Sequence, residues 1–78
     1  MTEPAADTLI DTRGLTCPLP VLKLKKALRD LKSGTLAEVL STDPGSVVDF
    51  ETLCEVVGHE IVTQSETDGE FRFLIRRK

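Results

Sequence analysis

The residues best suited to chemistry are four consecutive positions, Cys17-Pro18-Leu19-Pro20, directly ahead of an amphipathic segment. Proline suits the first position of a helix, because its missing N–H would have no partner there. Pro18 also disfavours a helical conformation at the preceding residue, which predicts Cys17 as the N-cap. A helix N-terminus carries unpaired N–H groups and a positive partial charge, and both stabilise a thiolate. Because the thiolate is the nucleophilic form of cysteine, this pattern predicts a reactive sulfur at Cys17.

One chemistry fits a single accessible thiol without a deep pocket, and that is the transfer of a sulfur atom. The thiolate attacks the outer sulfur of a donor persulfide, holds that sulfur as its own persulfide and passes it to a second thiolate. Both partners bring their own active sites, so we expect no cofactor beyond the covalent persulfide on Cys17. The alternative is that Cys17 only stands at the start of the helix and has no special reactivity.

Backbone donors near Cys17 set the expected acidity of its thiol. Pro18 and Pro20 carry no N–H, whereas residues 14–16, Leu19 and Val21 keep theirs. We expect these donors to lower the pKa of Cys17 moderately, which leaves the sulfur nucleophilic, since nucleophilicity falls with thiol pKa. We also expect Gly14, Pro18 and Pro20 to fix the geometry of the loop that presents the sulfur.

Other uses of cysteine fit this sequence poorly. Two cysteines 37 positions apart and a single histidine match no zinc-ligand spacing, so no metal site is predicted. No acid or base flanks Cys17 in sequence, and His59 lies far along the chain, so a Cys–His dyad is not supported. We interpret Cys54, which lies on the apolar side of a helix, as a buried core residue. His59 is interpreted as a surface or capping residue.

The elements that must position Cys17 alternate along the chain. Their order, βαβαββ, predicts an α/β fold of the α+β two-layer sandwich type, with two helices packed on one face of a four-stranded mixed sheet. Gly34 is a candidate C-cap for the first helix, Asp43 or Ser46 is expected to cap the second, and Asp68-Gly69 signals a hairpin turn. The predicted elements are strands at 8–12, 36–40, 61–64 and 71–76, a helix from Pro18 to Ser33-Gly34 and a helix from Asp43-Ser46 to Gly58.

Each predicted helix has one apolar face, as expected for a helix packed on a sheet. The faces consist of Val21, Leu24, Ala27, Leu28 and Leu31 in the first helix, and Val47, Phe50, Leu53, Cys54 and Val57 in the second.

The 78 residues are enough for one domain, which we place at residues 8–78 after a disordered tail at residues 1–7. A chain of this length buries about 60% of its unfolded-state surface, which leaves little room for a deep pocket. The acidic N-terminus lacks the features of a signal peptide, and no apolar run approaches the ~20 residues of a membrane span. We therefore expect a cytoplasmic protein without membrane association, and a monomer, because the thiol must reach several partners.

Charge is distributed unevenly, and the basic part lies next to Cys17. Six basic residues and one acid fall between Arg13 and Lys32, whereas residues 33–71 contain nine acids and no Lys or Arg. Such asymmetry favours docking on an acidic partner, with a solvated helix face as the alternative. The predicted docking surface is the exposed side of the first helix, with Leu19, Leu22, Lys23, Lys26 and Arg29.

The segment Asp11-Thr12-Arg13-Gly14-Leu15-Thr16-Cys17-Pro18-Leu19-Pro20 resembles the signature of the TusA (SirA-like) sulfur-carrier family. The resemblance runs from about Leu9 to Arg77 and implies a fold similar to the C-terminal domain of translation initiation factor three. It implies a sulfurtransferase whose persulfide is carried on Cys17. It further implies a cysteine desulfurase or rhodanese-like donor and a TusD/DsrE-like acceptor, in tRNA wobble-uridine 2-thiolation or in sulfur oxidation.

Two other functions are kept as alternatives. A small nucleic-acid-binding module would use the basic helix, but the net charge is −3 and no aromatic platform for stacking bases is evident, so stable nucleic-acid binding is not expected. A thiol-redox module would pair Cys17 with Cys54, but an N-cap thiol and a core thiol are not expected to approach within the ~7 Å between Cα atoms that a disulfide requires.

Overall fold

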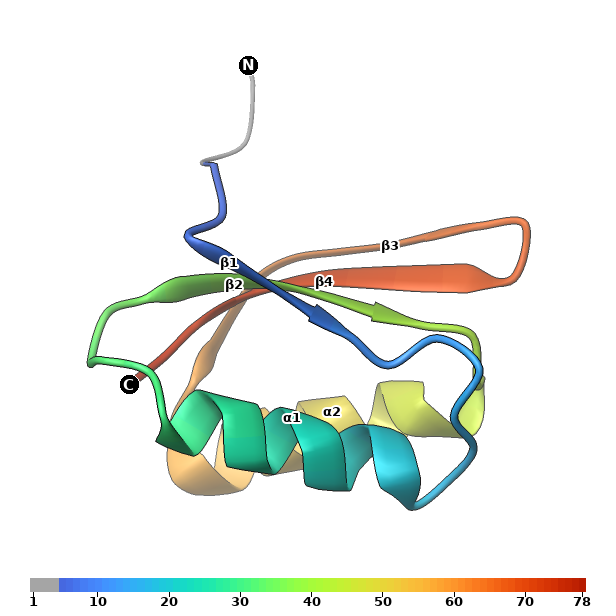
Figure 1. The fold of residues 1–78 in the computed structure, drawn as a ribbon, viewed down its shortest axis with the longest axis horizontal. Coiled ribbons are helices and arrows are strands. Elements are labelled where there is room, and N and C mark those ends of the chain that lie inside the picture. Colours follow the sequence, from blue (N-terminus) through green and yellow to red (C-terminus); the bar gives the residue numbers. More distant parts are fainter. Residues whose placement is uncertain (1–4) are drawn as a thin grey trace.

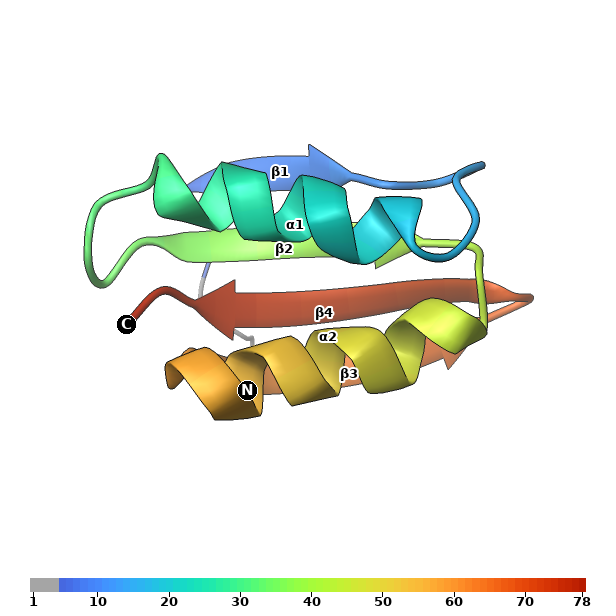
Figure 2. The same cartoon turned by 90° about the horizontal axis from the view of Figure 1, so that it is seen from below.

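The computed structural model describes residues 5–78 and forms two layers, with two helices packed on one face of a four-stranded sheet (Figures 1 and 2). The strands are β1 (Thr8–Asp11), β2 (Leu36–Ser41), β3 (Glu60–Thr67) and β4 (Glu70–Arg76), and the helices are α1 (Leu19–Arg29) and α2 (Gly45–Val57). The order βαβαββ and the two-layer α+β fold predicted from the sequence are confirmed.

The sheet is mixed, with the strand order β1-β2-β4-β3. β1 pairs in parallel with β2, whereas β4 pairs antiparallel with both β2 and β3. The carboxyl ends of two parallel strands meet at one edge of a sheet, which is where functional loops gather in such folds. Both helices begin at this edge, so the β1–α1 loop with its cysteine lies beside the β2–α2 loop (Figure 2).

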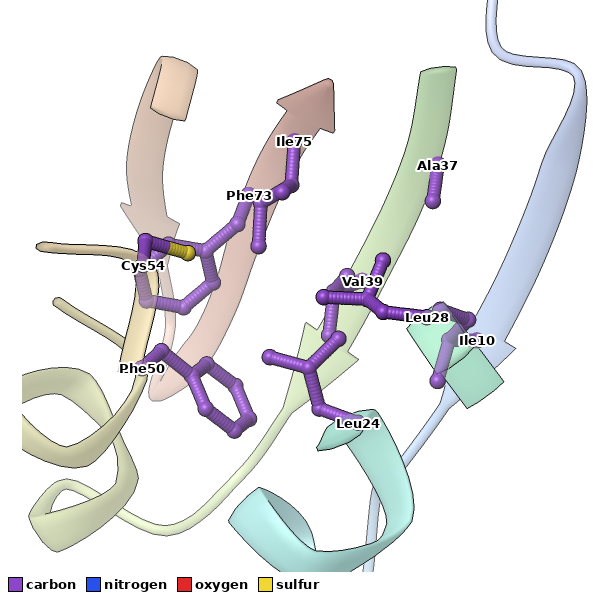
Figure 3. Close-up of a cluster of buried hydrophobic side chains, with 9 residues drawn as sticks. All are labelled: Ile10, Leu24, Leu28, Ala37, Val39, Phe50, Cys54, Phe73 and Ile75. Carbon is purple, nitrogen blue, oxygen red and sulfur yellow. The ribbon is translucent and has the colours of Figure 1, made fainter. Parts of the chain in front are cut away.

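The core lies between the helices and the sheet and is centred on two aromatic rings. Phe50 of α2 and Phe73 of β4 pack edge to face, with ring centroids 5.1 Å apart and planes at 78°. Cys54 is 2% exposed, which confirms the prediction that it is a core residue. The buried cluster consists of Ile10, Leu24, Leu28, Ala37, Val39, Phe50, Cys54, Phe73 and Ile75 (Figure 3).

The first helix is shorter than its sequence pattern predicts. It ends at Arg29 rather than near Gly34, because the N–H groups of Asp30 and Leu31 bond three residues back and tighten the last turn. Gly34 has a φ of +85° but lies in the loop before β2, where its N–H donates to the carbonyl of Arg77. Gly34 therefore shapes this loop and does not cap α1.

Three other local predictions can be compared with the structure. Gly58 ends α2 with a φ of +100°, and the Asp68-Gly69 turn has both residues at positive φ, as predicted. The N-cap of α2 is Pro44 rather than Asp43 or Ser46. β3 covers Glu60–Thr67 instead of 61–64, because its pairing with β4 continues as far as the hairpin turn.

One residue of the predicted tail contacts the sheet. Of the expected disordered tail at 1–7, residues 1–4 lie outside the described residues. Asp7 is attached to the sheet, because its N–H donates to the Leu36 carbonyl at 2.7 Å and its carboxylate accepts from the Leu36 N–H at 2.9 Å. Within residues 5–78, no helix is long and apolar enough to cross a membrane.

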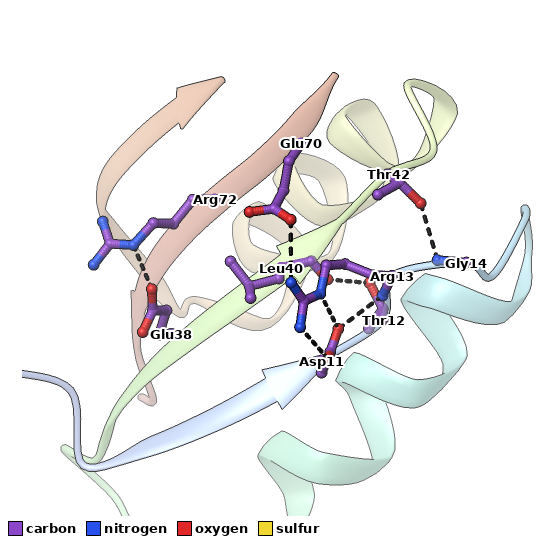
Figure 4. A network of polar contacts seen from close by, with 9 residues as sticks. All are labelled: Asp11, Thr12, Arg13, Gly14, Glu38, Leu40, Thr42, Glu70 and Arg72. Carbon is purple, nitrogen blue, oxygen red and sulfur yellow. Dashed lines mark hydrogen bonds and ion pairs between the residues drawn. The ribbon is translucent and has the colours of Figure 1, made fainter. Parts of the chain in front are cut away.

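Ion pairs on the sheet face opposite the helices tie the β1–α1 loop to β4 (Figure 4). Arg13 contacts the carboxylate of Asp11 at 2.8 Å and that of Glu70 at 3.2 Å, while Arg72 pairs with Glu38. The hydrogen bonds from Arg13 lower the pKa of Asp11 to about 2, so this pair stays charged at neutral pH. Exposed pairs of this kind contribute little stability each, so their main effect is to orient the loop.

Candidate functional site

The thiol of Cys17 is presented one position before the N-cap of α1. Pro18, not Cys17, is the N-cap, because the first helical hydrogen bond runs from the Leu22 N–H to the Pro18 carbonyl. A separate turn bond from the Leu19 N–H to the Thr16 carbonyl precedes it, and the Cys17–Pro18 peptide bond is cis. The side chain of Cys17 is exposed, so the sulfur stands at the edge of the domain.

Two hydrogen bonds join the loop that carries Cys17 to the neighbouring β2–α2 loop. The Gly14 N–H donates to Oγ1 of Thr42 at 2.9 Å, and the Cys17 N–H donates to Oδ2 of Asp43 at 2.8 Å (the first is drawn in Figure 4). The other carboxylate oxygen of Asp43 accepts from the Gly45 N–H at the start of α2. Asp43 therefore fixes the backbone of Cys17 relative to the second helix.

Buried hydroxyl groups hold the β1–α1 and β2–α2 loops to the core of the domain. Oγ1 of Thr12 donates to the Leu40 carbonyl at 2.5 Å, which ties the end of β1 to β2. The hydroxyls of Ser41 and Ser46 lie 2.6 Å apart, and both side chains are almost completely buried. Buried polar groups are stable only when hydrogen-bonded, so these contacts specify the position of each loop.

Gly14 is required by its backbone conformation rather than by space. Its φ is +81°, which side chains rarely adopt, yet an added Cβ would meet nothing within 4 Å. Together with the bond to Thr42, this turn directs the chain from the end of β1 towards α1. The structure thus gives a physical reason for the predicted involvement of Gly14 in the loop geometry.

The third group at the site is Asp49 of α2, which the sequence analysis did not single out. Sγ of Cys17 donates to Oδ2 of Asp49 at 3.3 Å, across 32 positions of sequence. Asp49 lies four residues before Leu53, at the border of the apolar face of α2, and this placement was the only signal in the sequence. Nothing in it indicated that α2 would pack with that border facing Cys17.

The surroundings of Cys17 raise the pKa of its thiol, so the predicted lowering is wrong. The hydrogen bond to Asp49 is the largest cause, followed by desolvation and by the negative charges of Asp49 and Asp43. Three of the donors expected to stabilise a thiolate are occupied, because the N–H groups of Gly14, Leu15 and Leu19 bond to oxygens of the protein itself. The free thiol is therefore held protonated against a carboxylate.

Replacement of Asp49 by asparagine is expected to lower the pKa of Cys17. The substitution removes the charge that opposes the thiolate while keeping an oxygen that accepts a hydrogen bond. Below the thiol pKa, the gain in thiolate outweighs the loss of intrinsic nucleophilicity, so alkylation by iodoacetamide at pH 7 should accelerate. The pH profile of the alkylation rate, followed by intact mass, measures both effects.

The matched control for this prediction is Glu55→Gln, which removes one exposed negative charge from the same helix without touching Cys17. It should leave the pH profile at its wild-type position. A profile that shifts equally in both variants would show that overall charge, not the contact with Asp49, sets the pKa.

The predicted docking residues are all exposed, but one of them has a partner within the protein. Leu19 and Leu22 are about half exposed, and Lys26 and Arg29 are exposed as predicted. Nζ of Lys23 instead donates to the carbonyl of Asp11 at 2.6 Å, which commits this side chain to the end of β1.

Beside the sulfur, α1 and α2 border a cavity of about 480 Å³, here called the thiol cavity. It brings Leu22 of the predicted docking surface together with Cys17 and with Asp49. Its lining includes Cys17, Pro18, Val21, Leu22, Asp49 and Val56.

Cys54 and His59 lie apart from this site. Burial raises the pKa of Cys54 to about 11, so its thiol is both inaccessible and un-ionised at neutral pH. His59 follows α2, and its Nδ1 accepts the N–H of Lys78 at 3.0 Å. Within residues 5–78, no three His, Cys, Asp or Glu side chains gather closely enough to hold a metal ion.

Comparisons with known proteins agree with the resemblance seen around Cys17. A family model described as "Sulfurtransferase TusA" matches residues 8–77. The chain is 44% identical over 71 residues to the sulfur carrier protein TusA of Allochromatium vinosum, which covers 91% of this chain and 93% of that relative. It is 40% identical over 78 residues to the sulfur carrier protein TusA of Pseudomonas putida, covering 100% of this chain and 98% of the relative. Among solved structures it is similar to the SirA-like protein from Desulfitobacterium hafniense, with a TM-score of 0.78, 31% identity, and coverage of 88% of this chain and 95% of that one.

Proposed function

Because the chain belongs to the TusA family of sulfur carrier proteins, we propose that Cys17 accepts a sulfane sulfur as a persulfide and passes it to an acceptor protein. The observation that carries the proposal is an exposed thiol whose sulfur lies 3.3 Å from a carboxylate oxygen of Asp49. A thiol that already donates to a carboxylate has an acceptor at hand for the proton that it must lose when it attacks.

In the loading step, Sγ of Cys17 attacks the outer sulfur of a donor persulfide as its proton passes to Asp49. A new S–S bond joins Cys17 to the transferred sulfur, while the S–S bond of the donor breaks and its cysteine leaves as a thiolate. One S–S bond replaces another, so the step needs no external oxidant or reductant. The leaving thiolate takes up the proton from Asp49.

In the unloading step, an acceptor thiolate attacks the outer sulfur of the persulfide on Cys17. The bond between Cys17 and that sulfur breaks, and the Cys17 sulfur takes up a proton and regains its hydrogen bond to Asp49. Between encounters the raised pKa keeps the sulfur as a thiol, which oxidants attack more slowly than a thiolate. The carboxylate thus protects the resting carrier and receives its proton during transfer.

The loop contacts complete the proposed site without taking part in bond changes. Asp43 binds the N–H of Cys17, Gly14 supplies the left-handed turn, and Pro18 with Pro20 sets the beginning of α1. Each of these contacts acts on the backbone and so leaves the sulfur free to meet two partners in turn.

The donor in this proposal is a cysteine desulfurase or a rhodanese-like protein, and the acceptor is a TusD/DsrE-like protein. Such a carrier acts as a sulfurtransferase either in 2-thiolation of the tRNA wobble uridine or in sulfur trafficking during sulfur oxidation. Transfer from the loaded protein to the acceptor of one route, and not to that of the other, would assign the pathway.

The test of the proposal is the intact mass of the protein after incubation with a cysteine desulfurase and cysteine. We expect a gain of one sulfur atom that a reductant removes, and peptide mapping should locate it on Cys17 and not on Cys54. Failure to gain sulfur from a desulfurase, from a rhodanese and from polysulfide would overturn the carrier function. Salt-dependent tRNA binding by the same protein would then favour the nucleic-acid-binding alternative.

A further inference from the structure

A second cavity, of about 360 Å³, lies at the far end of the space between α1 and α2. We call it the basic cavity, because four of its side chains are cationic and no acidic side chain of residues 5–78 lines it. Its lining includes Lys25, Arg29, Leu53, His59, Arg77 and Lys78.

The two cavities form one groove that starts at the reactive sulfur. They share Lys25 of α1 and Leu53 of α2, so the two cavities adjoin along the helices. Figure 2 shows that α1 and α2 run side by side from the edge of the β1–α1 loop to the end marked C. The groove therefore connects Cys17 with the basic cavity along the length of α1.

The groove has charges of opposite sign at its two ends. Asp49 lies at the thiol end, whereas Arg29, Arg77 and Lys78 surround the other end. Within the described part of the chain, the side chains of Arg29 and Lys78 form no ion pair. The side chains that line the basic cavity therefore carry a surplus of positive charge. This cavity is thus suited to an anionic group from another molecule.

Between the charged ends, the groove carries exposed apolar side chains beside Lys25. Val56 is 79% exposed and Leu22 54% exposed, although both border the thiol cavity. Such side chains favour an apolar occupant, because covering them removes apolar surface from water.

The length of the groove sets the size of its occupant. α1 spans 11 residues, which at 1.5 Å per residue corresponds to about 16.5 Å. An extended chain advances at most ~3.6 Å per residue, so about four or five residues cover this distance.

We infer that the groove binds an extended segment of a sulfur-exchanging partner, with its cysteine at Cys17 and a carboxylate about four or five residues away in the basic cavity. Apolar residues of the segment lie between these two groups, over Leu22 and Val56. The inference rests on the proposed function, because only a sulfur-exchanging partner must bring a cysteine to Cys17. Repulsion by Asp49 at one end and attraction by Arg29 and Lys78 at the other orient the segment.

The probe is a short peptide whose cysteine is activated as a mixed disulfide with thionitrobenzoate. Cys17 attacks the peptide sulfur, a disulfide joins the two cysteines, and thionitrobenzoate leaves as a coloured thiolate. One peptide carries a glutamate five positions from the cysteine, with apolar residues between, and its partner carries glutamine there. Each peptide is made in two versions, with the glutamate or glutamine either after or before the cysteine, so that both chain directions in the groove are tested.

At low ionic strength the glutamate peptide is expected to react about fivefold faster than the glutamine peptide in one chain direction, a difference typical of one partly exposed charge contact. The preference should disappear in the Arg29→Gln/Lys78→Gln variant. It should persist in Lys32→Gln/Arg76→Gln, which removes the same charge from exposed positions outside both cavities. Added salt should reduce it.

Equal rates for the two peptides in both directions, or an equal loss of preference in both double variants, would overturn the inference. Sulfur loading from a desulfurase, measured on the same preparations, separates this result from a failure of the proposed function. Normal loading without a peptide preference would contradict the groove alone, whereas absence of loading from every donor would contradict the carrier function itself.

Discussion

The Cys17→Ser variant is expected to gain no sulfur from any donor persulfide while folding as the wild type does. A serine hydroxyl stays protonated at neutral pH and forms no stable bond to sulfane sulfur, so the loss should be complete. The fold should persist because the side chain of Cys17 is exposed and its contact with Asp43 is made through the backbone N–H. Intact mass after incubation with a cysteine desulfurase and cysteine measures loading, and urea denaturation measures stability.

The matched control is Cys54→Ser, which makes the same replacement of sulfur by oxygen at the other cysteine. Cys54 is buried, and its pKa of about 11 leaves it un-ionised, so the variant should still load one sulfur atom. It should lose some stability, because a hydroxyl replaces an apolar sulfur in the core. Transferable sulfur on the Cys17→Ser protein, or loading lost in both variants, would contradict the assignment of the carrier to Cys17.

The largest effect on stability is expected from Phe50→Ala. Phe50 is completely buried and packs edge to face on Phe73 with ring centroids 5.1 Å apart. Loss of a buried phenylalanine costs about 3–5 kcal/mol of unfolding free energy, and small domains have only about 5–15 kcal/mol in total. The variant should therefore unfold at a much lower urea concentration or be partly unfolded without denaturant. Because Asp49 precedes Phe50 on α2, the thiol should also lose its carboxylate partner as the helix loosens.

Val48→Ala serves as the control on the same helix, since Val48 is 63% exposed. Its unfolding free energy should stay within about 0.5 kcal/mol of the wild type. If Phe50→Ala cost less than about 1 kcal/mol, the core would be packed differently from the edge-to-face arrangement of Phe50 and Phe73.

Local sequence patterns were sufficient for most of the architecture. Apolar spacing placed Leu24 and Leu28 of α1 and Phe50 and Cys54 of α2 on the buried faces. These predictions succeed because helical periodicity depends on near neighbours. The length of α1 was overestimated because a glycine after an apolar helical pattern is typical of a C-cap. Gly34 does have a positive φ, but the bond from its N–H to the Arg77 carbonyl shows that it belongs to the loop before β2.

The identity of the reactive residue was likewise evident from sequence, because Cys17 and the prolines that follow it are adjacent in the chain. The acidity of the thiol was not. Sequence neighbours suggested donors that lower the pKa, whereas the fold uses three of those donors for other hydrogen bonds and brings Asp49 to the sulfur from 32 positions away. A pKa depends on all charges within a few ångströms, and only the packing of α2 against α1 determines which ones those are.

The sequence by itself therefore determined the elements, the buried faces and the nucleophile, all of which follow from residue type and short-range spacing. Tertiary structure alone decided the protonation of Cys17, the attachment of its loop through Asp43 and the groove that links the sulfur to Arg29 and Lys78. The physical reason is that these properties arise between α1, α2 and the end of β4, whose mutual positions are set by long-range packing.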